Sequence, residues 1–213
     1  MITTMEIVIA VVLFASLFPG AAVKRYYRKK AEKLATGKSP LKNKTERILT
    51  MSLLIAFSTI FGFLAPFFLV FDVYHLLMDW SSLAFLITSS RLLITLQIIG
   101  ICLYIIGYII YLTGRLAIGE RFSELWSPAR ISDGFAHTGI FSRWRHPLYS
   151  GSIIFSFGLV LMFQTWFGLL LYIYPLYVMI KTSLAEERWL IERFGDEYEQ
   201  YMKRSWRFFP KLW

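Results

Sequence analysis

Most of the side chains in this sequence that can do chemistry lie in two short segments. Residues 133–149 read DGFAHTGIFSRWRHPLY, and residues 184–210 read LAEERWLIERFGDEYEQYMKRSWRFFP. The stretch between them is apolar, since residues 147–180 contain no Asp, Glu, Lys or Arg. An Arg-His pair before such a stretch and a Glu pair after it predict a polar site at the boundary of an apolar layer.

The first segment predicts an anion site at the start of a helix. Pro147 suits the first helical position because it has no N–H to lose there, and this puts His146 near the N-cap. The free N–H groups of the first turn attract anions, and Arg145 adds a planar fork for a carboxylate. Tyr149 and Phe141 lie beside this turn and can stack on an adenine. The alternative is that Arg145 and Tyr149 only anchor the chain at a membrane interface.

The second segment begins with two glutamates. Glu186 and Glu187 follow directly after the apolar stretch, at a depth where an unpaired carboxylate is costly. We therefore expect cationic side chains to face them. Arg188 and Glu192 are four residues apart, and we expect them to form an exposed pair on a helix. If the apolar stretch is a hairpin, His146 and Glu186 can meet in one pocket.

The rest of the second segment predicts an amphipathic C-terminal helix. Its large apolar side chains recur at helical spacing, as in a helix that lies on a membrane surface. We interpret these side chains as membrane anchors rather than as ligand contacts; they are Trp189, Leu190, Phe194 and Tyr198.

The composition predicts an integral membrane protein. Of the 213 residues 56% are hydrophobic, and the mean hydropathy is +0.53, which exceeds what soluble domains show. The net charge of +9 could indicate nucleic acid as a partner. The basic residues flank apolar runs, however, so we expect membrane lipid as the partner and no nucleic acid.

The apolar runs predict an all-α protein with about five transmembrane helices. Residues 7–23, 48–71 and 92–113 each come near the roughly 20 residues that one crossing needs. Residues 147–180 would form a helix of about 51 Å, which is too long for one crossing. Residues 164–168, QTWFG, offer a polar and glycine break near the middle of this run, so we expect a hairpin of two short helices.

Lys and Arg predict the orientation of these helices. Residues 24–47 hold ten of the 23 basic residues, residues 115–145 hold five and residues 181–211 hold seven. The positive-inside rule places these segments on the cytoplasmic side. We expect residues 1–113 to hold three spans, with a basic cytoplasmic loop at 24–47. Residues 114–213 are expected to hold a cytoplasmic cofactor loop, the hairpin at 147–182 and the amphipathic helix.

Several known frameworks are missing from the sequence. It contains no G-x-G-x-x-G unit, no H-E-x-x-H and no P-loop. Three histidines and the single Cys102 make a metal site unexpected. Gly100, Gly107 and Gly114 recur every seven residues and predict close packing of another helix.

Together the two segments resemble a known family. The motifs HTGIFSRWRHPLYSG and EERWLIERFGDEYEQYMKRSWRFFP are similar to those of isoprenylcysteine carboxyl methyltransferases and of the wider group of small integral-membrane methyltransferases, which includes phospholipid methyltransferases. The resemblance covers roughly the last 80 residues. Phe141, where relatives often carry Tyr, and Lys181 with Thr182, where eukaryotic members carry Arg, depart from the pattern.

The resemblance implies S-adenosylmethionine as methyl donor. The acidic pair Glu186 and Glu187 matches the pair that the family places between cofactor and acceptor, and with Arg145 it makes the candidate catalytic set. The candidate cofactor-binding residues are Phe135, Ala136, His137, Phe141, His146, Pro147, Leu148 and Tyr149.

The expected activity is methyl transfer to an acceptor embedded in the membrane, with the carboxylate of a prenylated cysteine as the first choice. Three alternatives stay open. These are an N-methyltransferase acting on a phospholipid amine, an NADPH-dependent enzyme similar to sterol reductases, and a membrane scaffold without enzymatic activity.

Overall fold

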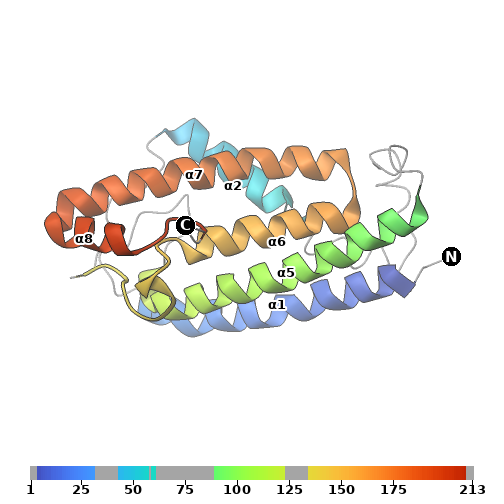
Figure 1. The fold of residues 1–213 in the computed structure, drawn as a ribbon, viewed down its shortest axis with the longest axis horizontal. Coiled ribbons are helices and arrows are strands. Elements are labelled where there is room, and N and C mark those ends of the chain that lie inside the picture. Colours follow the sequence, from blue (N-terminus) through green and yellow to red (C-terminus); the bar gives the residue numbers. More distant parts are fainter. Residues whose placement is uncertain (1–3, 32–42, 58, 61–88, 123–133, 210–213) are drawn as a thin grey trace.

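The computed structural model of this chain is a bundle of long helices that run side by side (Figure 1). It describes residues 4–31, 43–57, 59–60, 89–122 and 134–209. Within these ranges the chain forms helices and no strand, so the predicted all-α fold is confirmed for them.

Within the described ranges, three helices are long and apolar enough to cross a membrane. They are α1 (Thr4–Ala31), α5 (Ser90–Ile118) and α7 (Trp166–Phe194). The apolar helix α6 (Pro147–Phe163) has 17 residues, or about 26 Å, which is near the lower limit for a crossing. The helix α2 (Lys44–Phe57) carries the start of the predicted second span. The rest of that span lies largely outside the described residues. Five crossings therefore stay a prediction.

Helices α6 and α7 form a hairpin at the predicted break. Gln164 adopts a left-handed conformation with φ 51° and ψ 44°, and the Thr165 side chain caps α7. The second helix is not short, because α7 continues through the charged residues as far as Phe194. Residues 181–194 contain neither Gly nor Pro, and Leu, Ala, Glu and Arg in this stretch favour helix. Gly195, with φ 52°, ends the helix.

Helix α6 packs against α5 at backbone contact distance. A Cβ added to Gly107 would lie 2.4 Å from the Phe155 nitrogen, and one added to Gly151 would lie 2.5 Å from the Tyr111 nitrogen. Side chains larger than hydrogen therefore do not fit where these helices cross. The predicted packing stripe is confirmed, since each of its members faces α6: Gly100, Gly107 and Gly114. This contact fixes the first turn of α6 in place.

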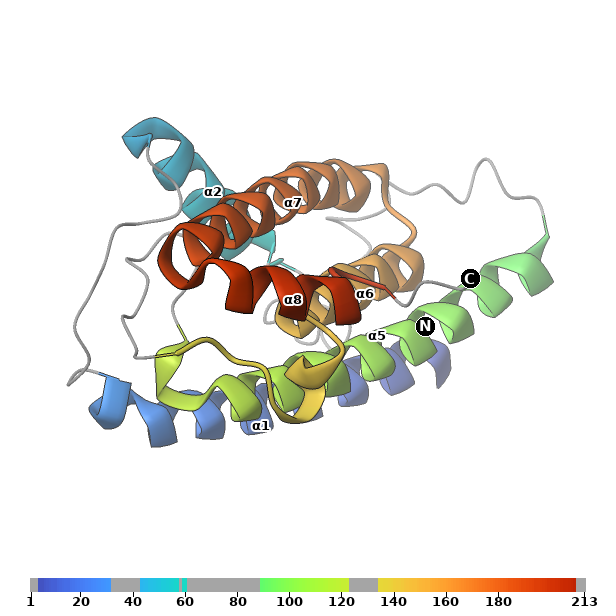
Figure 2. The same cartoon turned by 60° about the vertical axis from the view of Figure 1, so that its left-hand side comes forward.

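The ends of the helices that carry the reactive segments lie together. The C-terminal ends of α1, α5 and α7 and the N-terminal end of α6 meet at one end of the molecule, beside α8 (Asp196–Arg204) (Figures 1 and 2). Among the described residues, Arg121, Arg145 and Arg207 lie at that end. The side of the membrane that it faces stays a prediction.

Candidate functional site

The chain that follows α8 is paired with the residues that precede α6. We call residues 205–209 the C-terminal strap. The Arg145 N–H donates to the Trp206 carbonyl at 2.7 Å, and the His146 N–H donates to the Arg207 carbonyl at 3.1 Å. The first of these bonds, with the Trp206 N–H to Arg143 carbonyl bond at 2.7 Å, forms an isolated parallel bridge between Trp144 and Trp206. The strap thus holds the Arg-His pair from outside the hairpin.

Glu187 is the centre of a buried charged cluster. Its side chain is only 3% exposed. Arg145 Nε donates to Oε1 at 2.9 Å, and His146 Nε2 lies 3.2 Å from the same oxygen. Arg207 Nε and Nη2 donate to Oε2 at 3.0 and 2.6 Å. The expectation that cationic groups face this carboxylate is confirmed, and its hydrogen bonds raise the pKa of Arg207.

Arg145 is bonded mainly within the chain. Besides Glu187, its guanidinium donates from Nη1 to the carbonyls of Met202 and Ser205, at the end of α8. The fork predicted to receive a ligand carboxylate is therefore held by Glu187 and by the last turn of α8. The physical reason is that a buried carboxylate and uncapped helix carbonyls compete for the same donors.

Glu186 has different surroundings from its neighbour in sequence. Its side chain is 35% exposed. The Tyr149 hydroxyl donates to Oε1 at 2.7 Å, and His146 Nδ1 lies 3.7 Å from Oε2. No Arg or Lys in the described part of the chain pairs with this carboxylate. The prediction that the two segments meet across the hairpin is confirmed by these contacts.

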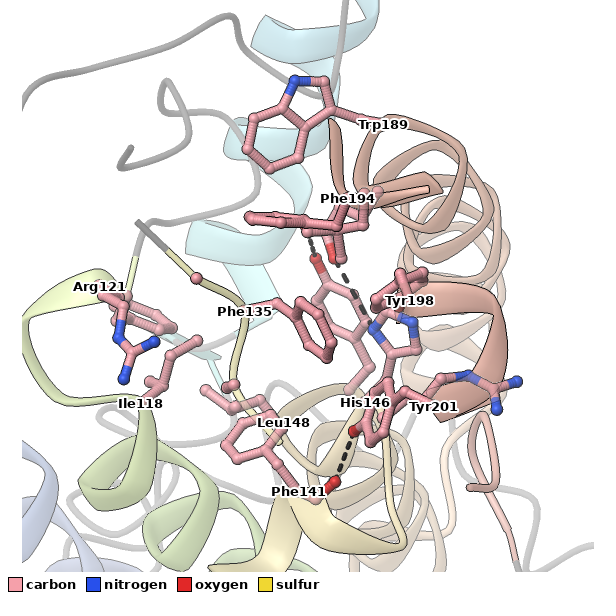
Figure 3. Close-up of a pocket in the computed structure, with 17 residues that line it drawn as sticks. Ile118, Arg121, Phe135, Phe141, His146, Leu148, Trp189, Phe194, Tyr198 and Tyr201 are labelled. Carbon is pink, nitrogen blue, oxygen red and sulfur yellow. Dashed lines mark hydrogen bonds and ion pairs between the residues drawn. The ribbon is translucent and has the colours of Figure 1, made fainter. Parts of the chain in front are cut away.

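Glu186 is one of the residues that line a pocket with aromatic walls, and Figure 3 shows this pocket. Its central ring is Phe135, whose centroid lies 5.3 Å from that of Phe194 and 5.0 Å from that of Tyr198. Tyr201 lies beneath, and its hydroxyl donates to the Phe141 carbonyl. The pocket therefore combines flat apolar walls with one carboxylate that pairs with no guanidinium of the described residues.

The structure brings most of the predicted site residues together. Three do not line the pocket. Glu187 lies in the buried cluster, His137 is exposed with Nδ1 3.0 Å from the Phe135 carbonyl, and Pro147 is buried against Gly114 of α5. The others line it, and they are Phe135, Ala136, Phe141, Arg145, His146, Leu148, Tyr149 and Glu186.

The sequence reasoning missed other lining residues. The side chains interpreted as membrane anchors face the pocket, and they are Trp189, Leu190, Phe194 and Tyr198. Helical spacing shows that they share a face but not whether that face meets lipid or a cavity. Tyr201 continues the same face three residues after Tyr198, which was the available signal. Ile118, Arg121 and Phe122, which follow the third span, also line the pocket and carry no sequence signal.

Two buried tyrosines stay neutral beneath the pocket. Burial raises the pKa of Tyr201 to about 12, and it also raises the pKa of Tyr198. Both phenols therefore remain hydrogen-bond donors near neutral pH. No group of three metal-ligating side chains occurs among the residues that the structure describes.

Comparison with known proteins places this geometry in context. Residues 95–197, from α5 to the first turn of α8, match the family described as Phospholipid methyltransferase. The chain is also similar to the Protein-S-isoprenylcysteine O-methyltransferase of Schizosaccharomyces pombe, with 33% identity over 88 residues. The matched part covers 40% of this chain and 37% of that relative. The resemblance predicted from the two motifs is confirmed.

Proposed function

We propose that this chain is a multi-pass membrane methyltransferase that uses S-adenosylmethionine, because residues 95–197 match the family described as Phospholipid methyltransferase. The proposed acceptor is the carboxylate of a prenylated cysteine, and the site faces the cytoplasm. The observation that carries the proposal is the pocket at the start of α6, where the partly exposed carboxylate of Glu186 stands among aromatic side chains.

The residues of the pocket fit the charges and the ring of this donor. Its sulfonium and ammonium groups are cationic, and Glu186 offers a carboxylate that is not paired with Arg or Lys in the described residues. Its own carboxylate suits the N-terminal end of α6, where no side chain caps the first turn. Phe135 and Phe141 supply flat faces for the adenine.

The remaining proposed roles follow from position. His146, Leu148 and Tyr149 hold the donor from the first turn of α6, and Ala136 and His137 belong to the loop above it. Arg145 lines the pocket, but its guanidinium is bonded to Glu187 and to carbonyls of the chain, and Glu187 and Pro147 lie outside the pocket wall. These three position the residues that hold the donor.

The chemistry that S-adenosylmethionine supplies when bound is an electrophilic methyl group on a positively charged sulfur. A carboxylate acceptor is already ionised at neutral pH, so no general base is required. The chain must then align the acceptor oxygen and exclude water. Glu186 holds the cationic end of the donor, while the aromatic walls of the pocket exclude water.

A phospholipid amine is the second candidate acceptor, and the description of the matched family favours it. An amine must lose a proton on methylation. Glu186, or His146 beside it, is then the candidate base. Both comparisons name methyltransferases, which favours methyl transfer over the reductase and scaffold alternatives.

Transfer of a tritiated methyl group from S-adenosylmethionine tests the proposal. The purified protein is offered N-acetyl-S-farnesylcysteine or phosphatidylethanolamine vesicles, and the products are treated with base. A methyl ester releases volatile methanol, whereas an N-methyl group does not. We expect base-labile counts that depend on farnesylcysteine. Base-stable counts in lipid would select the second candidate, and a folded protein that labels neither acceptor would contradict both.

The rate of transfer at different pH values separates the two acceptors further. A carboxylate acceptor should give a nearly constant rate around neutrality, since it needs no base. An amine acceptor should give a rate that rises with pH.

A further inference from the structure

The C-terminal strap, residues 205–209, belongs to the site although it contributes nothing to the pocket wall. We propose that Arg207 is a positioning residue, which acts through Glu187 to hold His146 against Glu186. The effect on turnover rests on the proposed function. The effect on structure does not.

A continuous series of contacts leads from the strap to the pocket. Arg207 holds Glu187 with two nitrogens, at 2.6 and 3.0 Å from Oε2. Glu187 Oε1 lies 3.2 Å from His146 Nε2, and His146 Nδ1 lies 3.7 Å from Glu186 Oε2. The imidazole thus lies between the two glutamates. Of the four residues in this series, His146 and Glu186 line the pocket, and Arg207 and Glu187 do not.

Arg207 and Arg145 bind this carboxylate in different ways. Arg145 donates one bond to Glu187, from Nε to Oε1, and its Nη1 donates to carbonyls of the chain. Arg207 bonds both oxygens, since its Nε donates to Oε1 at 3.1 Å and to Oε2 at 3.0 Å while its Nη2 donates to Oε2 at 2.6 Å. A two-point grip fixes the plane of a carboxylate, which a single bond cannot do. Arg207 therefore turns Oε1 of Glu187 towards His146.

The strap also fixes His146 through its backbone and its ring. The Arg207 carbonyl accepts the His146 N–H, and the Phe208 carbonyl accepts from Ser150 Oγ at 2.7 Å in the first turn of α6. The imidazole lies between two rings, 5.5 Å from Tyr149 and 5.9 Å from Phe208. Loss of the strap would remove the Phe208 ring and the backbone acceptor that hold His146 in place.

Kinetics of Arg207→Gln, Arg207→Lys and the control Lys203→Gln test the catalytic consequence. Lys203 is an exposed cation of α8, four residues before Arg207, without a hydrogen bond or ion pair among the described residues. We expect Arg207→Gln to lower kcat about 10- to 100-fold, as loss of a supporting polar contact does, with KM for the acceptor little changed. Arg207→Lys should recover part of kcat, and Lys203→Gln should retain all of it.

A double variant separates positioning from general damage. If Arg207 acts through Glu187, then Arg207→Gln combined with Glu187→Gln should lose no more than the worse single variant. Additive losses, or a fall in Arg207→Gln that Lys203→Gln shares, would overturn the proposal.

Amide hydrogen exchange provides a readout that needs no activity. Residues 143–150 contain the Arg145 and His146 N–H groups that bond to the strap. Arg207→Gln should speed exchange in this segment, while Lys203→Gln should not. Faster exchange in a protein that transfers no methyl group would contradict the proposed function and support the positioning. Unchanged exchange in Arg207→Gln would overturn the positioning whatever the activity.

Discussion

Replacing Glu187 by glutamine should cost stability as well as the activity that it supports through His146, whereas the same change at Glu186 should cost activity alone. The two carboxylates are neighbours in sequence, yet Glu187 is 3% exposed with two arginines, and Glu186 is 35% exposed beside a pocket. The change Glu→Gln keeps the shape of the side chain and removes its charge. It therefore isolates the electrostatic part of each role.

The expected stability loss follows from the hydrogen bonds of Glu187. Arg145 donates one and Arg207 donates two, one from each of two nitrogens. A charged partner strengthens each bond by about 1 kcal/mol, so neutralising it costs about 3 kcal/mol. Arg207 is 37% exposed, and solvent screening lowers the total to about 2 kcal/mol. For a chain of this size that corresponds to a fall of about 4–8 °C in Tm.

Glu186→Gln should leave Tm nearly unchanged, because its amide oxygen can still accept from Tyr149. Methyl transfer should fall about a hundredfold, the scale of one catalytic polar contact. The control Glu192→Gln changes an exposed carboxylate and should alter neither property. Tm is measured by thermal unfolding in detergent, and transfer by tritium counting at matched amounts of folded protein. If Glu186→Gln unfolded at a lower temperature than Glu187→Gln, the assignment of the two roles would be wrong.

Two further predictions concern the scaffold and its dependence on pH. Gly107→Ala should lower Tm, at a cost of about 1–3 kcal/mol, because the added Cβ would lie 2.4 Å from the Phe155 nitrogen. The control Cys102→Ala changes an exposed position of the same helix and should leave Tm unchanged. Tyr201 has a folded pKa of about 12 against an ordinary value of 10, so its contribution to stability is complete below pH 10 and is lost as pH rises through 12. Tm measured by thermal unfolding should fall with pH between pH 10 and 12, and it should fall less steeply in Tyr201→Phe than in the wild type. Equal slopes of Tm against pH would refute this contribution.

The hairpin and the meeting of the two motifs could be predicted from the sequence. An uncharged run too long for one crossing needs a turn, and Gln164 with Thr165 is its polar break. A turn there brings both motifs to one end of the bundle. The length of α7 could not be predicted in the same way, since residues 181–194 suit either a continued helix or a separate one on the membrane surface.

The partners of the two glutamates could be predicted only in part. The cost of a buried carboxylate required a cation near Glu187, but its identity depends on the path of the chain after α8. Arg207 lies 20 residues away, beyond Gly195, and no periodicity connects the two. Helical spacing likewise identified the shared face of Trp189 and Phe194 without showing that it lines a pocket.

Calorimetric titration of S-adenosylmethionine into the detergent-solubilised protein tests the central claim most directly. The wild-type chain should bind it, Glu186→Gln should bind it about tenfold more weakly, as loss of about 1.4 kcal/mol implies, and Glu192→Gln should bind it as the wild type does. Binding of NADPH in place of S-adenosylmethionine, or equal affinity in Glu186→Gln and the wild type, would contradict the assignment of this pocket.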